Sequence, residues 1–171
     1  MSGVASPRWF PHYYDAASDS VLIVERSEEE YRAASFLDDR SLSPQTARHL
    51  VPWSQIAGAV PADARRDLNF IFHIGHVGST LISRLLGELP QVFALREPVI
   101  LRDVAERLAE RGLPEALWPA ESVPKRLDVV TALLSRTWRP EGTARLPRSP
   151  TTGVSPPRGT ATRDSATPWR L

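Results

Sequence analysis

Residues 69–86, with the sequence NFIFHIGHVGSTLISRLL, place the strongest constraint on the fold of this chain. A short apolar run passes through a glycine-containing turn directly into a segment whose leucines and isoleucine recur with helical spacing. A strand, a glycine loop and a helix in this order present free backbone N–H groups and the positive end of a helix dipole to an anion. The pattern predicts an α/β fold with a site for a phosphate-type group at the loop.

The overall composition is that of a soluble globular protein, with 42% hydrophobic and 24% charged residues in a chain of 171. The absence of cysteine excludes a disulfide framework, a thiolate metal site and a thiol nucleophile. The N-terminus lacks the apolar core of a signal peptide, and no apolar run approaches the roughly 18 residues that span a bilayer. We therefore expect a cytoplasmic protein that does not bind membranes.

Positive charge is concentrated in residues 142–171, which contain five arginines and one acidic residue. Because this net charge of +4 exceeds the +1 of the whole chain, the rest of the protein is mildly acidic and is not expected to bind nucleic acid. Seventeen of these thirty residues are Pro, Gly, Ser or Thr, which leaves few apolar side chains to bury. We expect a disordered tail over 140–171.

Short sequence signals predict the other helices and strands of the chain. Ser27 with Glu30 has the spacing of a helix-capping box, and Ser43 before Pro44 is typical of a second helix start. Strands joined by one helix with short connections predict a right-handed βαβ unit with parallel pairing. We expect an irregular lead-in over 1–19, strands at 21–24, 68–74 and 91–95, and helices at 28–37, 44–50, 79–89, 101–108 and 123–138. Residues 1–66 then form the first part of one domain, and 67–139 form its α/β nucleotide-binding core.

The loop itself reads Gly75-His76-Val77-Gly78-Ser79-Thr80. A loop that hydrolyses ATP or GTP needs four residues between its glycines and then a lysine, whereas here two residues separate them and no lysine occurs in 69–89. The dinucleotide fingerprint also fails, because its first glycine pair is missing. The loop amides with the Ser79 and Thr80 hydroxyls are suited to one terminal phosphate. The alternative is a sharp strand-to-helix corner in which Ser79 only caps the helix.

The run FHIGHVGSTLISRLL followed by FALREP resembles the sulfotransferase superfamily, whose 5′-phosphosulfate loop has the form P-[KR]-x-G-[ST]-T. Here Gly75 stands in place of the proline, His76 in place of the lysine or arginine, and Gly78-Ser79-Thr80 match the rest. The resemblance covers about residues 67–98, and extends less specifically to FLDDR at 36–40 and to the expected helix that ends at Trp138. It implies a parallel sheet flanked by helices and a sulfate donor, 3′-phosphoadenosine 5′-phosphosulfate, bound at residues 75–80.

The same resemblance assigns a role to Glu97. In the family branch that sulfates tyrosine in proteins, a glutamate just after the second strand acts as the base, and Glu97 falls at the matching position. Parallel strands would bring Glu97 and the loop to one edge of the sheet, where a hydroxyl acceptor fits between them. We predict sulfuryl transfer to a hydroxyl without a metal, with Glu97 and His76 as catalytic residues.

Several of these residues also have simpler interpretations. Glu97 precedes Pro98 and is also suited to complementing a helix N-terminus. His76 fits an exposed loop residue, and His73 within the apolar run is typical of a hydrogen-bonded core histidine. The pair His73 and His76 has no third ligand nearby, so we expect no zinc site. Arg96 and Arg102 are suited either to an anionic substrate or to the solvated surface.

The later elements of a sulfotransferase, a third strand and the arginine and serine that grip the donor's 3′-phosphate, are not recognisable after Arg139. We expect the N-terminal portion of a sulfotransferase-like protein whose end is aberrant, as an out-of-frame reading would produce. An incomplete sheet leaves an unpaired edge, which predicts weak catalysis and self-association. Two other functions stay open: a small-molecule phosphotransferase with a variant loop, and a non-catalytic interaction module.

Overall fold

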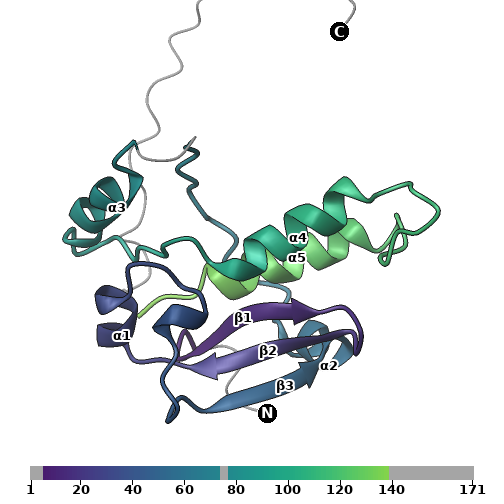
Figure 1. Cartoon of the computed structure of the whole chain (residues 1–171), viewed down its shortest axis with the longest axis horizontal. Coiled ribbons are helices and arrows are strands. Elements are labelled where there is room, and N and C mark those ends of the chain that lie inside the picture. Colours follow the sequence, from purple (N-terminus) through teal and green to yellow (C-terminus); the bar gives the residue numbers. More distant parts are fainter. Residues whose placement is uncertain (1–5, 74–76, 139–171) are drawn as a thin grey trace, which may run out of the picture.

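A three-stranded antiparallel sheet, in the order β1-β2-β3, forms the centre of the computed structural model, which describes residues 6–73 and 77–138. β1 spans Trp9–Asp15, β2 spans Ser20–Glu25 and β3 spans Arg48–Pro52. β2 is the central strand (Figure 1), and its Val24 pairs with Phe10 of β1 and with Arg48 of β3. The Val-Leu-Ile-Val run of β2 favours this position because branched side chains pack well on a pleated surface.

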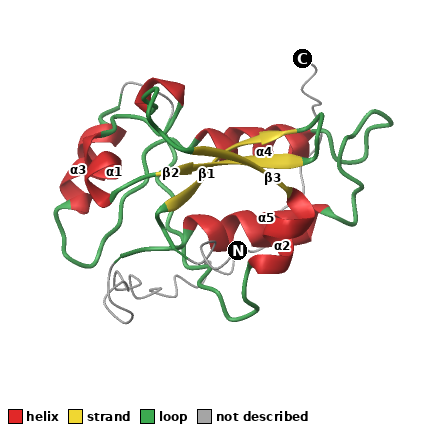
Figure 2. Cartoon of the chain, turned by 90° about the horizontal axis from the view of Figure 1, so that it is seen from below, coloured by secondary structure: helices red, strands yellow, loops and turns green. Residues whose placement is uncertain are grey.

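Two helices near the C-terminal end of the described chain provide much of the core. α4 (Val99–Ala109) and α5 (Val123–Leu134) each contact β1 and bury one side, α4 through Ile100 and Val104 and α5 through Val130 and Leu133. α4 and α5 overlap in the view of Figure 1, and the view of Figure 2 shows them separately. α2 (Trp53–Ala59) follows β3 directly and contacts α5. The result is a mixed α/β fold with five α-helices in the described residues.

The remaining helices lie at one end of the molecule. α1 (Glu28–Ala33) and the short 3₁₀ helix η1 (Asp39–Ser41) follow β2, and α3 (Ser79–Gly87) lies beside α1 in both views (Figures 1 and 2). α3 contains no buried residue, and its Leu81 and Leu85 side chains are each 62% exposed. This helix therefore adds little to the core.

Several elements are confirmed where local signals predicted them. Ser27 is the N-cap of α1: its hydroxyl accepts the Glu30 N–H, and the Glu30 carboxylate accepts the Ser27 N–H. β2, α3 and α4 form within a few residues of the expected bounds, and α5 begins at the predicted Val123 with Pro124 in its first turn. α5 ends at Leu134 rather than Trp138, whose ring instead packs on Phe93 and Tyr31.

Two predictions in the N-terminal half are wrong. The expected irregular lead-in forms β1, whose register shifts between Pro11 and Tyr13, a place where a strand tolerates a proline. The expected helix at 44–50 is a turn followed by β3. The Ser43 carbonyl accepts the Thr46 N–H at 3.1 Å, and Arg48–Pro52 then pairs with β2. Pairing with the central strand outweighs the local helix-start signal.

The strands predicted at 68–74 and 91–95 are also not formed in the described part of these segments, where the backbone is irregular. Such runs become strands only when a neighbour supplies hydrogen-bond partners. The only sheet within 6–73 and 77–138 is antiparallel and lies elsewhere, so a parallel sheet around the glycine loop is not seen there. Ile74 and the predicted tail at 140–171 lie outside the described residues.

Candidate functional site

The second glycine of the loop has the geometry that the sequence suggested. Gly78 adopts φ +81°, a left-handed conformation that glycine favours, and it is the N-cap of α3. Its carbonyl accepts the Ile82 N–H at 3.0 Å, which closes the first helical turn. Nothing lies within 4 Å of where a Cβ would be, so the backbone angle and not crowding requires glycine there. Gly75 and His76 lie outside the described residues.

The two hydroxyl residues after Gly78 lie inside the first turn of α3. Ser79 is the first helical residue and not the cap, so the alternative in which Ser79 caps this helix is wrong. Within the described chain, the Ser79 and Thr80 hydroxyls make no hydrogen bond. The N–H groups of a first helical turn have no acceptor within the helix. Val77 is exposed beside them. Amide and hydroxyl donors thus share one helix end.

Glu97 lies in a strained backbone conformation. Its φ of +46° is in the left-handed region, which is uncommon for any residue with a Cβ. Leu37 fixes the backbone on both sides: its N–H donates to the Arg96 carbonyl at 2.8 Å, and its carbonyl accepts the Val99 N–H at 3.4 Å. The Glu97 side chain stays 51% exposed. The carboxylate is therefore held outward by a backbone that is anchored on both sides.

The structure brings Glu97 close to the segment that leads into the loop. Its Oε1 lies 3.7 Å from Nε2 of His73, the last described residue before position 77. His73 is exposed, so the prediction that it is a core histidine is wrong. Glu97 does not cap α4 either, because the N-cap is Pro98 and no side chain provides a cap hydrogen bond. Glu97 still directly precedes the N-cap of α4, so the simpler interpretation, an acid that complements this helix N-terminus, stays open.

Arg96 has a structural role that sequence reasoning missed. It is 7% exposed, and its guanidinium donates to the carbonyls of Tyr31, Arg32 and Ala34 around the end of α1. These are carbonyls that a helix end leaves without partners. Burial, together with the positive charge of Arg84, lowers the pKa of Arg96. Arg96 thereby fixes the chain immediately before Glu97.

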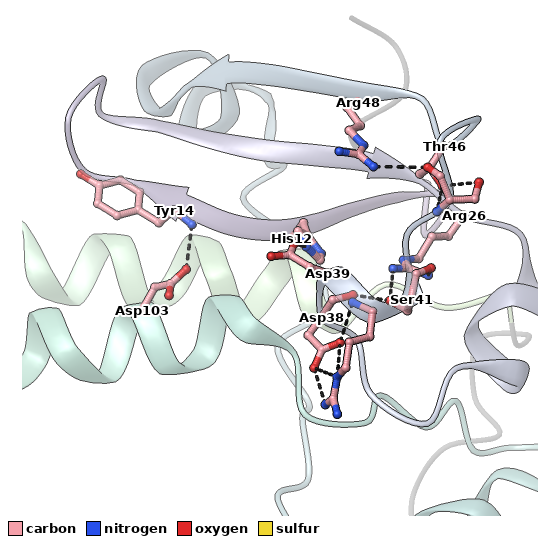
Figure 3. Close-up of polar contacts among 11 residues, drawn as sticks. His12, Tyr14, Arg26, Asp38, Asp39, Ser41, Thr46, Arg48 and Asp103 are labelled. Carbon is pink, nitrogen blue, oxygen red and sulfur yellow. Dashed lines mark hydrogen bonds and ion pairs between the residues drawn. The ribbon is translucent and has the colours of Figure 1, made fainter.

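A second polar cluster lies on the FLDDR segment. Nε of Arg40 donates to the Asp38 carboxylate at 2.9 Å, and this hydrogen bond lowers the pKa of Asp38. Asp39 Oδ1 lies 2.8 Å from Nε2 of His12, a residue of β1 that is fully buried (Figure 3). The side chain of Arg40 also covers the ring of Phe36 at 4.4 Å. The paired acids and arginine in the sequence were the only signal for this cluster.

Metal and membrane features are absent from the part of the chain that the structure describes. No group of three or more His, Asp or Glu side chains there is arranged to hold a metal ion. None of the helices within 6–73 and 77–138 is long and apolar enough to cross a bilayer.

Comparisons with known proteins identify no relative. Neither a family model, nor a curated protein, nor a solved structure matches the chain. Function is therefore inferred from the residues of the site together with the resemblance of the loop sequence.

Proposed function

We propose that the chain binds 3′-phosphoadenosine 5′-phosphosulfate at the loop 75–80 and transfers its sulfuryl group to a hydroxyl acceptor. One observation carries the proposal: the Glu97 carboxylate is held outward at φ +46° and lies 3.7 Å from His73, on the segment that enters the loop. Strained residues of this kind concentrate at functional sites because the surrounding structure must hold them in place. The open first turn of α3, which begins after Gly78, supplies donors for the phosphate.

The proposed reaction is an in-line displacement at sulfur. The acceptor oxygen forms a bond to sulfur while the bond from sulfur to the bridging oxygen breaks, and adenosine 3′,5′-bisphosphate leaves with that electron pair. Glu97 takes the acceptor proton, an effect typically worth about 10²–10⁴ in rate. The loop amides and the Thr80 hydroxyl stabilise the charge on the leaving phosphate, and His76 supplies a positive charge only while protonated. No metal takes part.

Binding and transfer are tested separately. Adenosine 3′,5′-bisphosphate should raise the melting temperature of the full chain, and ATP with magnesium should not. Glu97→Gln should keep this binding but lower sulfation of a phenolic acceptor by about 10²-fold or more, because the amide cannot take a proton. Thr80→Val should weaken both the binding of the bisphosphate and the sulfation. Arg102→Ala, at an exposed residue of α4, should change neither binding nor sulfation. Stabilisation by ATP and not by the bisphosphate would instead favour the phosphotransferase.

One observation favours a second candidate, an interaction module that associates with itself. The segment before the loop and α3 expose large apolar side chains, among them Phe72 at 90%, Leu81 at 62% and Leu85 at 62%. Exposed apolar surface on this scale marks interaction sites in soluble proteins. This candidate predicts that neither nucleotide stabilises the chain and that association depends on concentration.

A further inference from the structure

A cavity of about 280 Å³ lies between the end of α1, the end of α3 and the segment 92–96. Figures 1 and 2 both place these elements next to one another. Tyr31, Val92 and Phe93 form the apolar part of its wall. The charged part consists of Arg32, Arg84, Glu88 and Arg96. The cavity therefore combines an apolar wall with several charges from three separate segments.

The charges in the cavity are unbalanced. Three arginines and one glutamate line the cavity, and the Glu28 carboxylate beside Arg32 brings the local net charge to +1. Arg32 is paired with Glu28 at 3.6 Å, whereas Arg84 and Arg96 have no carboxylate partner among the described residues. Arg84 donates to the Ser35 hydroxyl at 3.1 Å, and the known acceptors of Arg96 are backbone carbonyls. Arg84 is exposed, but Arg96 is buried, and a buried guanidinium that lacks a counter-ion is costly, so this arrangement suits an anion.

We propose that this cavity binds a small phosphate monoester, with the phosphate between Arg84 and Arg96 and the organic group against Phe93 and Val92. A phosphate monoester offers three terminal oxygens to the two guanidinium groups of Arg84 and Arg96, whereas a carboxylate offers two. Guanidinium groups bind phosphate oxygens through paired, charge-assisted hydrogen bonds. The volume of about 280 Å³ is at the lower end for ligand pockets, which limits the ligand to a small molecule.

The cavity is separate from the glycine loop and does not depend on the proposed function. It reaches α3 at Arg84, Gly87 and Glu88, whereas the loop ends at Ser79 and Thr80, at the start of this helix. Arg84 lies five residues after Ser79, a rise of about 7.5 Å along the helix, and the residues that line the two sites differ. The two sites can therefore be removed independently by substitution.

The test is a titration of the full chain with inorganic phosphate, phenyl phosphate and acetate at constant ionic strength. Calorimetry should give binding of both phosphates, with phenyl phosphate tighter because its ring contacts Phe93, and no binding of acetate. Arg84→Ala should weaken phosphate binding at least about tenfold, the loss expected for one charge-assisted pair. Arg84→Lys, which keeps the positive charge, should bind phosphate more tightly than Arg84→Ala but less tightly than the parent chain. Arg102→Ala and Thr80→Val serve as controls for surface charge and for the loop.

Nuclear magnetic resonance adds a local readout, since the Gly87 amide should shift on addition of phosphate in the parent chain but not in the Arg84→Ala variant. Unchanged affinity in the Arg84→Ala variant would overturn the inference. So would equal effects of acetate and phosphate, which would indicate only charge screening. Binding that disappears in Thr80→Val but persists in Arg84→Ala would place the phosphate at the loop and also refute the cavity site.

Discussion

Glu97 has a left-handed backbone conformation that is less stable than the conformations a residue with a side chain prefers. A left-handed conformation costs a residue with a Cβ about 1–2 kcal/mol, whereas glycine adopts it freely. Glycine also gains freedom in the unfolded state, which offsets part of this difference. We expect Glu97→Gly to raise the free energy of unfolding by about 0.5–1 kcal/mol in urea denaturation. The same variant should abolish sulfation.

The matched control is Glu115→Gly, in an exposed turn where the backbone φ is not positive. There only the unfolded-state effect applies, so this variant should lose about 0.5–1 kcal/mol. Equal losses in the two variants would mean that the conformation of Glu97 carries no strain.

Asp103 on α4 has an environment that disfavours the charged form of its side chain. Its carboxylate accepts the Tyr14 N–H at 2.9 Å (Figure 3), yet burial raises its pKa above the ordinary value of 3.8. The folded state therefore binds this proton more tightly than the unfolded state does. The resulting contribution is favourable at low pH and is lost as pH rises from about 3.8 through the raised pKa.

Asp103→Asn should remove this dependence, because the amide oxygen still accepts the Tyr14 N–H but carries no charge. Compared with the parent, the variant should gain unfolding free energy as pH increases between about 4 and 7. Urea denaturation at several pH values measures the difference. Gln45→Asn, at an exposed residue without a titratable group, is the control and should run parallel to the parent. A parallel profile for Asp103→Asn would contradict the prediction.

At the scale of an element, α1 depends on its first turn because it is only six residues long. The capping box of Ser27 and Glu30 satisfies two donors that would otherwise lack partners. Ser27→Ala should lower the free energy of unfolding by about 1 kcal/mol, whereas Glu30→Gln should keep the box and most of the stability. Ser54→Ala, at an exposed residue of α2, is the control, expected to stay within about 0.5 kcal/mol. A similar loss at Ser54 would show that the cap is not responsible.

The elements that the sequence predicted are those specified by short-range chemistry. The Ser27 box, Pro124 at the start of α5 and the branched residues of β2 each act within a few residues, and the corresponding elements are confirmed. β1 and β3 were missed because their pairing with β2 joins distant segments that no local pattern reveals. Conversely, segments 68–73 and 91–95 have strand-like composition but lack paired neighbours. A segment therefore forms a strand only where a second segment pairs with it.

The candidate site likewise contains some residues that the local sequence identified and others that it did not. Gly78 was identifiable because a glycine between an apolar run and a helix start has a local meaning, and its φ of +81° agrees. The roles of Arg96 and Leu37 were not identifiable, since they depend on contacts with residues about sixty positions away. The position of Glu97 was expected from a parallel sheet. In the structure it instead follows from Leu37 and from the approach to His73.

At the scale of the whole molecule, the two ends differ in how their surfaces are protected. The antiparallel sheet has charged or proline residues on its outer strands, including Arg48 and Pro52 on β3, which discourages edge pairing. Segment 70–72 and α3 lack such protection, and Phe70 and Phe72 stack on each other while Phe72 is 90% exposed. Two aromatic side chains of this size already expose a few hundred Å² of apolar surface between them.

We therefore expect the full chain to self-associate through this surface, with an average mass that rises with concentration in sedimentation velocity. Leu81→Lys with Leu85→Lys should shift the chain to monomer, because charges on α3 would have to be desolvated at the contact. Since α3 contains no buried residue, the double variant should keep the parent's free energy of unfolding. Leu117→Lys, at a leucine that is 54% exposed beyond α4, should leave association unchanged. A parent chain that stays monomeric at all concentrations would refute association, and equal effects of all three lysines would point to net charge instead of this surface.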